Sequence, residues 1–185
     1  CESGKYKVGP GIQCDTCLAG KISASTGATS CASCEAGKFS TSGSGVCEPC
    51  AGGTYSPDPE SGSCDNCLAG YYSDPGAEEC THCGSGKYQS LPGQASCSDC
   101  PLGKALLWDG SQPSLECVEC EAGTFAASGG LSTCAACPPG KFSDSAAAEA
   151  CQDCVVGYFN PSTGQSNCLS SCPKGKYGTA IGAVS

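Results

Sequence analysis

The sequence predicts a small disulfide-rich fold, an elongated rod of tandem short β-hairpin and loop modules with little helix and no large hydrophobic core. Three observations lead to this prediction. Cysteine provides 21 of the 185 residues, Leu, Ile, Val and Phe together provide only 22, and one short pattern repeats along the whole chain. A chain with so few core-forming residues needs disulfides to restrict its unfolded state.

The repeated pattern is clearest in residues 34–50, CEAGKFSTSGSGVCEPC. A cysteine is followed three positions later by glycine, then by Lys, an aromatic residue, a small polar turn and a Cys-x-x-Cys pair. The pairs recur every 16 or 17 residues, with one step of 20. We therefore predict one array over residues 1–185, with modules at approximately 1–16, 17–33, 34–49, 50–66, 67–82, 83–99, 100–119, 120–136, 137–153 and 154–171 and a partial module at 172–185.

Each module should form a short irregular hairpin. Its glycine should adopt a positive φ or allow another backbone to approach closely. The next residue is Lys in seven of eleven copies and the one after it is aromatic in nine. Because neighbouring strand residues point to opposite sides, the rings should face inward and the lysines outward.

Turn residues such as Asp74-Pro75-Gly76 should then reverse the chain. No segment has a helical apolar period, so we expect almost no helix. Since repeats of this kind bury surface against their neighbours, each module should contact only the one before and the one after it.

One module departs from the pattern. Its loop between Cys100 and Cys117 is three residues longer, Ala105 replaces the aromatic residue, and the chain's only Trp follows. In one interpretation, Leu106 or Trp108 turns inward to fill the space left by Ala105. In the other, Leu106, Leu107 and Trp108 form an interaction loop that contacts a neighbouring chain, since indole is enriched at interface hot spots. The exposure of Trp108 distinguishes the two.

Two disulfide schemes fit the spacing. In the interlocking scheme, first cysteines bond first cysteines and second cysteines bond second ones in successive pairs. In the sequential scheme, which we favour because it uses Cys1 and keeps the loops similar in length, the second cysteine of each pair bonds the first of the next. Its bonds are Cys1–Cys14, Cys17–Cys31, Cys34–Cys47, Cys50–Cys64, Cys67–Cys80, Cys83–Cys97, Cys100–Cys117, Cys120–Cys134, Cys137–Cys151 and Cys154–Cys168.

The sequential scheme leaves only Cys172 without a partner. Cys1 stands in the position of the second half of a pair, and the last residues begin an eleventh module without its closing cysteine. We therefore expect the chain to be a segment of a longer array, which also explains the odd cysteine count.

The run C-x-x-G-K-[YF]-S…C-x-x-C resembles the ephrin-receptor-like cysteine-rich repeat of extracellular proteins. Its single-bridge loop is also similar to the first submodule of tumour necrosis factor receptor repeats, although the two-bridge submodules of those receptors are missing. The resemblance extends over essentially the whole chain. It implies an extracellular location and a rod of tandem disulfide modules, but not ephrin or cytokine binding, because the module occurs in many contexts.

Composition points to the same compartment. Disulfides on this scale persist only in oxidising surroundings, so the chain should be extracellular, secreted or on a cell surface. No apolar run approaches the roughly 20 residues that span a bilayer, so we expect no membrane insertion of this segment. Nine lysines and no arginine face 18 acidic residues, for a net charge of -9, which argues against nucleic acid as a partner. Ser- and Thr-rich turns leave room for O-linked glycans.

We expect no catalytic residue, cofactor or metal. Paired Cys-x-x-Cys motifs also suit zinc ribbons, but five such sites would leave one cysteine over, and a redox pair is normally single. The only histidine, His82, is expected to be a solvent-exposed filler. The acidic clusters Asp58/Glu60 and Glu78/Glu79 lack the spacing of a loop that encloses calcium.

The sequence thus favours a non-enzymatic extracellular structural protein, a disulfide-stapled rod in a filament, surface coat or stalk. Its expected partners are further copies of itself or other extracellular matrix or coat proteins. The alternative is the ectodomain of a cell-surface receptor or adhesion protein that binds a protein ligand.

Overall fold

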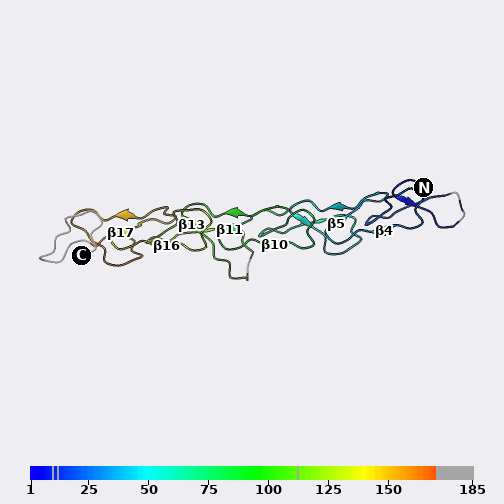
Figure 1. The fold of residues 1–185 in the computed structure, drawn as a ribbon. Coiled ribbons are helices and arrows are strands. Elements are labelled where there is room, and N and C mark those ends of the chain that lie inside the picture. Colours follow the sequence, from blue (N-terminus) through cyan, green and yellow to red (C-terminus); the bar gives the residue numbers. More distant parts are fainter. Residues whose placement is uncertain (10, 12, 112, 170–185) are drawn as a thin grey trace. The chain divides into compact units, whose positions relative to one another are not determined.

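A computed structural model describes residues 1–9, 11, 13–111 and 113–169 (Figure 1). By its internal contacts the chain divides into two compact units. Unit 1 comprises Cys1–Cys83 and Gln89–Cys97, and unit 2 comprises Gly84–Tyr88 and the chain from Ser98 onward. The partial module at 172–185, with Cys172, lies outside the described residues.

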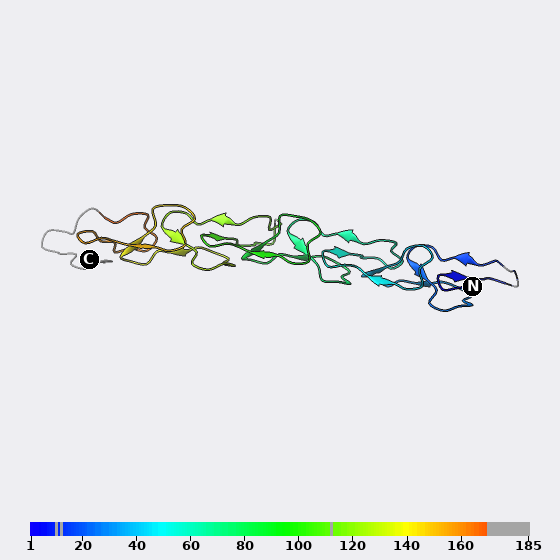
Figure 2. The same cartoon turned by 90° about the horizontal axis from the view of Figure 1, so that it is seen from above.

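The described chain contains nine two-stranded antiparallel hairpins and no helix, as the sequence predicted. Each hairpin is a separate sheet, and within each unit the hairpins follow one another along the chain (Figure 2). Their strand pairs are β1 (Lys5–Tyr6) with β2 (Asp15–Thr16), β3 (Lys21–Ile22) with β4 (Ala32–Ser33), β5 (Lys38–Phe39) with β6 (Glu48–Pro49), β7 (Thr54–Tyr55) with β8 (Asp65–Asn66), β9 (Tyr71–Tyr72) with β10 (Thr81–His82), β11 (Lys87–Tyr88) with β12 (Ser98–Asp99), β13 (Lys104–Ala105) with β14 (Val118–Glu119), β15 (Thr124–Phe125) with β16 (Ala135–Ala136), and β17 (Lys141–Phe142) with β18 (Gln152–Asp153).

The repeat pattern explains these short strands. The two residues after the glycine form the first strand, and the two residues inside each Cys-x-x-Cys pair form the second. The register places the Lys position opposite the second of these two residues, as in Lys87 opposite Asp99. In three hairpins the facing side chains form an ion pair: Lys87–Asp99, Lys104–Glu119 and Lys141–Asp153. Facing opposite charges of this kind stabilise a hairpin modestly.

Ten disulfides close the ten loops. Their pairing is the sequential one, from Cys1–Cys14 through Cys154–Cys168. Each bond spans 13 to 17 residues, a loop length for which a disulfide contributes about 3 kcal/mol by restricting the unfolded chain.

Backbone hydrogen bonds connect each module to the next. From Gly4 to Gly140, the N–H of the repeat glycine donates to the carbonyl oxygen three residues beyond the next repeat glycine. The carbonyl of the same glycine accepts from the N–H of the next module's first cysteine. In module 1 these bonds are Gly4 N to Ser23 O, 2.9 Å, and Cys17 N to Gly4 O, 3.0 Å. The donor bond recurs at Gly20, Gly37, Gly53, Gly70, Gly86, Gly103, Gly123 and Gly140.

The cysteine that begins each module is the centre of this network. Cys17 forms its disulfide within module 2, donates its N–H to Gly4 of module 1 and accepts at its carbonyl from Gly43 N of module 3, 2.9 Å away. The side chain of this cysteine is at most 1% exposed in every module from Cys17 to Cys154. One fully buried half-cystine therefore holds three consecutive modules together.

Contacts also reach the module after next, contrary to the expectation that each module contacts only its direct neighbours. A Cβ placed on Gly4 of module 1 would lie 1.9 Å from the carbonyl oxygen of Gly43 in module 3. The same approach recurs at Gly20–Glu60, Gly37–Gly76, Gly53–Gly93, Gly86–Gly130, Gly103–Ala147 and Gly123–Gly164. Each module is so thin that its turn extends past the preceding module and contacts the repeat glycine of the module before that.

The buried residues differ in part from those predicted. The aromatic rings are half-buried rather than buried, and several lysines, such as Lys21 and Lys38, are also half-buried. In several modules the small residue after the ring is buried instead, as at Ser40 and Ser56, both 1% exposed, whereas Lys7 and Gln89 in the same position are half-buried. A two-residue strand has no second layer to cover a ring, so only side chains that fit beneath the next module are enclosed.

The close approach at Gly37 gives the first testable prediction. Gly37 has a φ of 75°, and an added Cβ would lie 2.2 Å from the carbonyl oxygen of Gly76. Gly37→Ala should therefore lower the free energy of unfolding by about 1–2 kcal/mol from the left-handed backbone and by about 1–3 kcal/mol more from the clash. Scanning calorimetry under non-reducing conditions measures this loss.

Two control variants separate the two causes. Gly27 has a φ of 76° and no atom within 4 Å of an added Cβ, so Gly27→Ala should show only the smaller loss. Gly84 has neither constraint, and Gly84→Ala should leave the melting temperature nearly unchanged. Equal effects at Gly37 and Gly27 would contradict a contact with the module after next.

Candidate functional site

The long loop of module 7 projects apolar side chains into solvent. Ala105 is 6% exposed, and the position after it keeps the usual backbone bonds, since Leu106 O accepts from Gly86 N at 2.7 Å. Leu107 is 64% exposed and Trp108 is 38% exposed. Leu106 is half-buried, whereas the two residues after it are not enclosed. The half-buried Leu106 fits the first interpretation, and the exposed Leu107 and Trp108 fit the second.

Local hydrogen bonds give the Trp108 loop, residues 106–111, a defined shape. The backbone N–H of Trp108 donates to Ser85 Oγ at 3.1 Å. This bond holds the start of the loop against module 6, at a residue that belongs to the same unit. The Asp109 carboxylate accepts from the N–H of Ser111 at 2.9 Å and from its hydroxyl at 2.6 Å. The bond from the Ser111 hydroxyl has the larger effect and the bond from its N–H the smaller, and both lower the pKa of Asp109. The loop therefore carries a negative charge at neutral pH.

Two surface hollows in unit 1 have the same construction, and sequence analysis missed both. The Leu18 hollow has a volume of about 350 Å³ and the Leu68 hollow about 200 Å³. Each hollow lies between the aromatic residue of one module and a leucine of the next module. This leucine, Leu18 or Leu68, directly follows the first cysteine of its module and is 72% or 73% exposed. The Leu18 hollow is lined by Tyr6, Val8, Thr16, Leu18, Lys21, Thr29, Ser30 and Cys31, and the Leu68 hollow by Tyr55, Asn66, Leu68, Tyr71 and Cys80.

The lining residues correspond position by position. Tyr6 and Tyr55 both occupy the aromatic position, and Leu18 and Leu68 both follow a module's first cysteine. Lys21 of the first hollow is replaced by Tyr71 in the second. The available signal was the leucine after the cysteine, which recurs at these two positions, but a sequence pattern alone does not show that it faces a ring from the preceding module.

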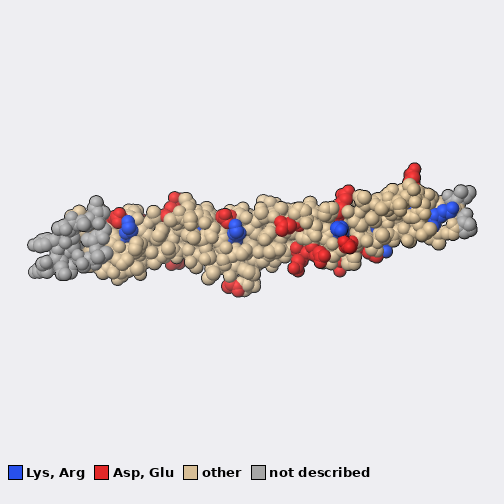
Figure 3. Space-filling model, viewed as in Figure 1, with Lys and Arg blue, Asp and Glu red and all other residues tan. Residues whose placement is uncertain are grey.

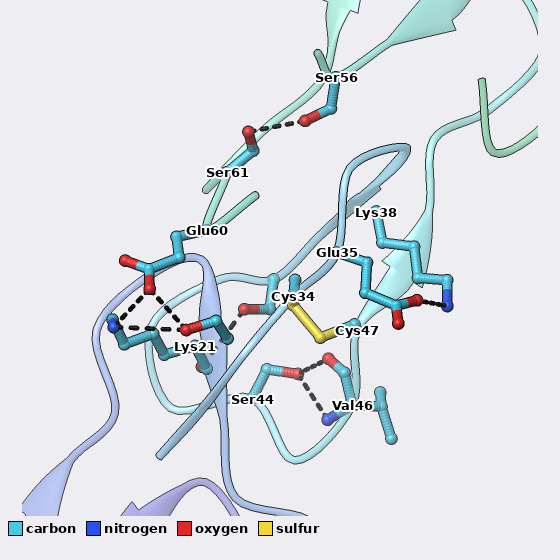
Figure 4. The surroundings of a disulfide bond; sticks show 12 residues. Lys21, Cys34, Glu35, Lys38, Ser44, Val46, Cys47, Ser56, Glu60 and Ser61 are labelled. Atoms are coloured by element: carbon cyan, nitrogen blue, oxygen red, sulfur yellow. Dashed lines mark hydrogen bonds and ion pairs between the residues drawn. A yellow bond between two sulfur atoms is a disulfide. The ribbon is translucent and has the colours of Figure 1, made fainter. Parts of the chain in front are cut away.

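One ion pair joins module 2 to module 4 beside the Cys34–Cys47 disulfide (Figure 4). Lys21 Nζ lies 2.8 Å from Glu60 Oε1, and the Ser33 hydroxyl donates to the same oxygen. The hydrogen bond from Lys21, followed by that from Ser33, lowers the pKa of Glu60. Glu60 thus connects module 4 to Lys21 and Ser33 of module 2.

The charged side chains form no single-sign surface on the face drawn in Figure 3, where uncharged surface predominates and several lysine atoms lie beside acidic ones. Five ion pairs join described residues, and they involve Lys21, Lys38, Lys87, Lys104 and Lys141. Lys7, between the lining residues Tyr6 and Val8, is in no ion pair with a described residue.

The described cysteines and the histidine, which were considered for metal or redox chemistry, lie in disulfides and against an aromatic ring. All cysteines from Cys1 to Cys168 are in disulfides, and no group of three or more His, Cys, Asp or Glu side chains in the described chain could hold a metal ion. His82 is not the exposed filler that was expected. It is half-buried in β10, and its ring meets that of Tyr71 edge-on, with centroids 4.9 Å apart.

Comparison with known families identifies the repeat. The family model described as tyrosine-protein kinase ephrin type A/B receptor-like matches residues 37–69, 70–113, 109–154 and 140–185. The chain belongs to the ephrin-receptor-like cysteine-rich repeat family. A search of the curated proteins found no significant match to this ephrin-receptor-like chain.

The ephrin-receptor-like repeats and the many disulfides fit an extracellular location. In the described part of the chain, no helix is long and apolar enough to cross a membrane.

The Lys21–Glu60 pair gives the second testable prediction. Because the folded-state pKa of Glu60 is lowered from an ordinary value of 4.5, its contribution to stability is present above that value and is lost as the pH falls through the folded-state pKa. Lys21→Met should raise the pKa of Glu60 toward its ordinary value. The melting temperature of this variant should therefore fall less on acidification than that of the native chain. Carboxyl-carbon NMR titration measures the pKa directly.

Glu35 supplies the control for this experiment. Its pKa is lowered by the hydrogen bond from Lys38 within the same module, so Lys21→Met should leave the Glu35 titration unchanged. An unchanged Glu60 titration in Lys21→Met would show that the pair between modules 2 and 4 does not form in solution.

Proposed function

We propose that this ephrin-receptor-like chain is a non-enzymatic extracellular structural protein, a disulfide-stapled scaffold that spans distance in a filament, surface coat or stalk. The observation that carries the proposal is the three-module connection, which recurs at Cys17, Cys34, Cys50, Cys67, Cys100, Cys120 and Cys137. Bending at one junction would break the glycine N–H bond to the next module, the cysteine carbonyl bond and the glycine contact with the module after next.

The proposal follows from how such contacts add. In arrays whose modules contact only near neighbours, stability and length both accumulate module by module. Here the contacts reach two modules ahead, which opposes bending more strongly than contacts with adjacent modules alone. A stiff extended array suits a spacer or coat, whose task is mechanical and needs no pocket for a substrate.

The exposed surface suits the same task. The positions after the first cysteine of each module, among them Leu18, Glu35, Ala51 and Leu68, are exposed and chemically diverse. A constant backbone can therefore display different side chains at regular intervals. Copies of the chain and other matrix or coat proteins are the partners that such a surface would meet. No observation on the described residues favours the receptor alternative over this one.

Small-angle X-ray scattering of the full chain under non-reducing conditions tests the proposal. We expect the profile of a thin stiff particle, and an expanded flexible chain after reduction of the disulfides. The double variant Gly37→Ala with Gly53→Ala, which places a Cβ 2.2 Å from a carbonyl oxygen at each site, should increase flexibility without breaking a disulfide. A Gly27→Ala control should scatter as the native chain does.

A flexible or compact native particle at all concentrations would contradict the scaffold. Antibody labelling of intact cells with native disulfide-bonded protein as the antigen provides the second measurement. Labelling only after permeabilisation would contradict the extracellular part of the proposal.

A further inference from the structure

We propose that the Trp108 loop of one chain docks into the Leu18 hollow of a second copy, so that the chains associate head to tail. The inference rests on the proposed function and names the contact through which the scaffold would extend. Its two halves are both present on one chain, an exposed apolar loop in unit 2 and an exposed apolar hollow in unit 1.

The loop has the character of an interface anchor. Leu107 and Trp108 are adjacent, exposed, and held by backbone and Asp109 bonds rather than by burial. Docking a loop that is already ordered costs little conformational entropy. Tryptophan at the centre of a contact commonly carries much of the binding energy.

Of the two hollows, the Leu18 hollow has the more suitable volume for the loop. Ligand-sized pockets begin at about 300 Å³, and the Leu18 hollow, at about 350 Å³, reaches this size whereas the Leu68 hollow, at about 200 Å³, does not. Val8, which is 77% exposed, adds an apolar wall to the Leu18 hollow beside Tyr6.

Charge selects the same hollow. The incoming loop carries the Asp109 carboxylate, which its pKa keeps ionised. Lys21 lines the Leu18 hollow but is paired with Glu60, and the acidic Asp15 adjoins the lining residue Thr16. Lys7, which does not line the hollow, lies between its lining residues Tyr6 and Val8 and is in no ion pair with a described residue. The Leu68 hollow has no lining lysine, and the acidic residues Asp65 and Glu79 adjoin its lining residues Asn66 and Cys80. It would repel the loop.

The symmetry of the contact determines what it builds. Loop and hollow are different patches, so the contact is heterologous, and such contacts generate rings or open-ended chains rather than closed dimers. A single loop buries too little area for a permanent interface, so each contact is weak in isolation. Assembly should therefore require a high local concentration of the chain.

The test uses the full chain under non-reducing conditions in sedimentation experiments from about 1 µM to about 1 mM, which covers weak affinities. The native chain should form assemblies larger than dimers as concentration rises. The emission of its only Trp should move to shorter wavelength as the indole leaves water. Trp108→Ala and Leu18→Asp should each weaken association at least about tenfold, as expected for a hot spot.

Mixing the two variants identifies the contact. Trp108→Ala retains the hollow, and Leu18→Asp retains the loop, so an equimolar mixture should form a dimer that grows no further. Only Leu18→Asp contributes a Trp to this mixture, and its emission should shift. Leu91→Asp changes an equally apolar residue that is 60% exposed and lines neither hollow, so it should associate as the native chain does. Leu68→Asp should do the same.

Four results would overturn the proposal: a native chain that stays monomeric at the highest concentration, a mixture that stays monomeric, equal weakening by Leu91→Asp, or loss of association in Leu68→Asp rather than in Leu18→Asp. Native circular dichroism and intact disulfides in every variant exclude misfolding as the cause. None of these results depends on the stiffness seen by scattering, so the contact and the scaffold can fail separately.

Discussion

The burial of one half-cystine per module is the constraint on which the rest of the structure depends. Its sulfur closes a loop within the module, while its backbone N–H and carbonyl bond to the modules on either side, as at Cys17. The N–H and the carbonyl of this buried cysteine thus both have partners, although each module encloses little more than a disulfide and one small side chain. A covalent bond and a short hydrogen-bond network thereby replace a conventional hydrophobic core.

The same constraint limits some positions strictly and leaves others free. The repeat glycine must lack a side chain because a carbonyl from the module after next lies against it, as Glu60 O does at Gly20. The residue that supplies this carbonyl needs a positive φ but no particular side chain. Glu60 and Ala147 adopt it with φ values of 63° and 58° where other modules have glycine. Glu60 offsets this backbone cost with its bonds to Lys21 and Ser33.

Much of the fold follows from the sequence because each hairpin depends on residues within one repeat. Fixed cysteine spacing is enough to predict the loops, and the Lys-aromatic pair is enough to place the first strand. The contact between Gly4 and Gly43 could not be predicted, because nothing in either repeat indicates how far its turn extends. The Leu18 hollow was missed for a related reason: Tyr6 and Leu18 belong to different repeats, and only the structure shows them side by side. The sequence also could not show how far each side chain of the module 7 loop turns inward: Leu106 is half-buried, whereas Trp108 is 38% exposed.

Module 7 shows why such an array can acquire a site without losing its fold. The insertion lies after Leu106, and two backbone bonds that connect modules lie outside it: Gly103 O still accepts from Cys120 N, and Leu106 N still donates to Leu131 O. In the long loop that follows, Leu107 is exposed, whereas Ser114 is buried. Because these two bonds involve only backbone atoms, neither the loss of the ring at Ala105 nor the longer loop interrupts them. A surface difference in one module is thus compatible with an unchanged scaffold, which lets a uniform repeat carry a local binding element.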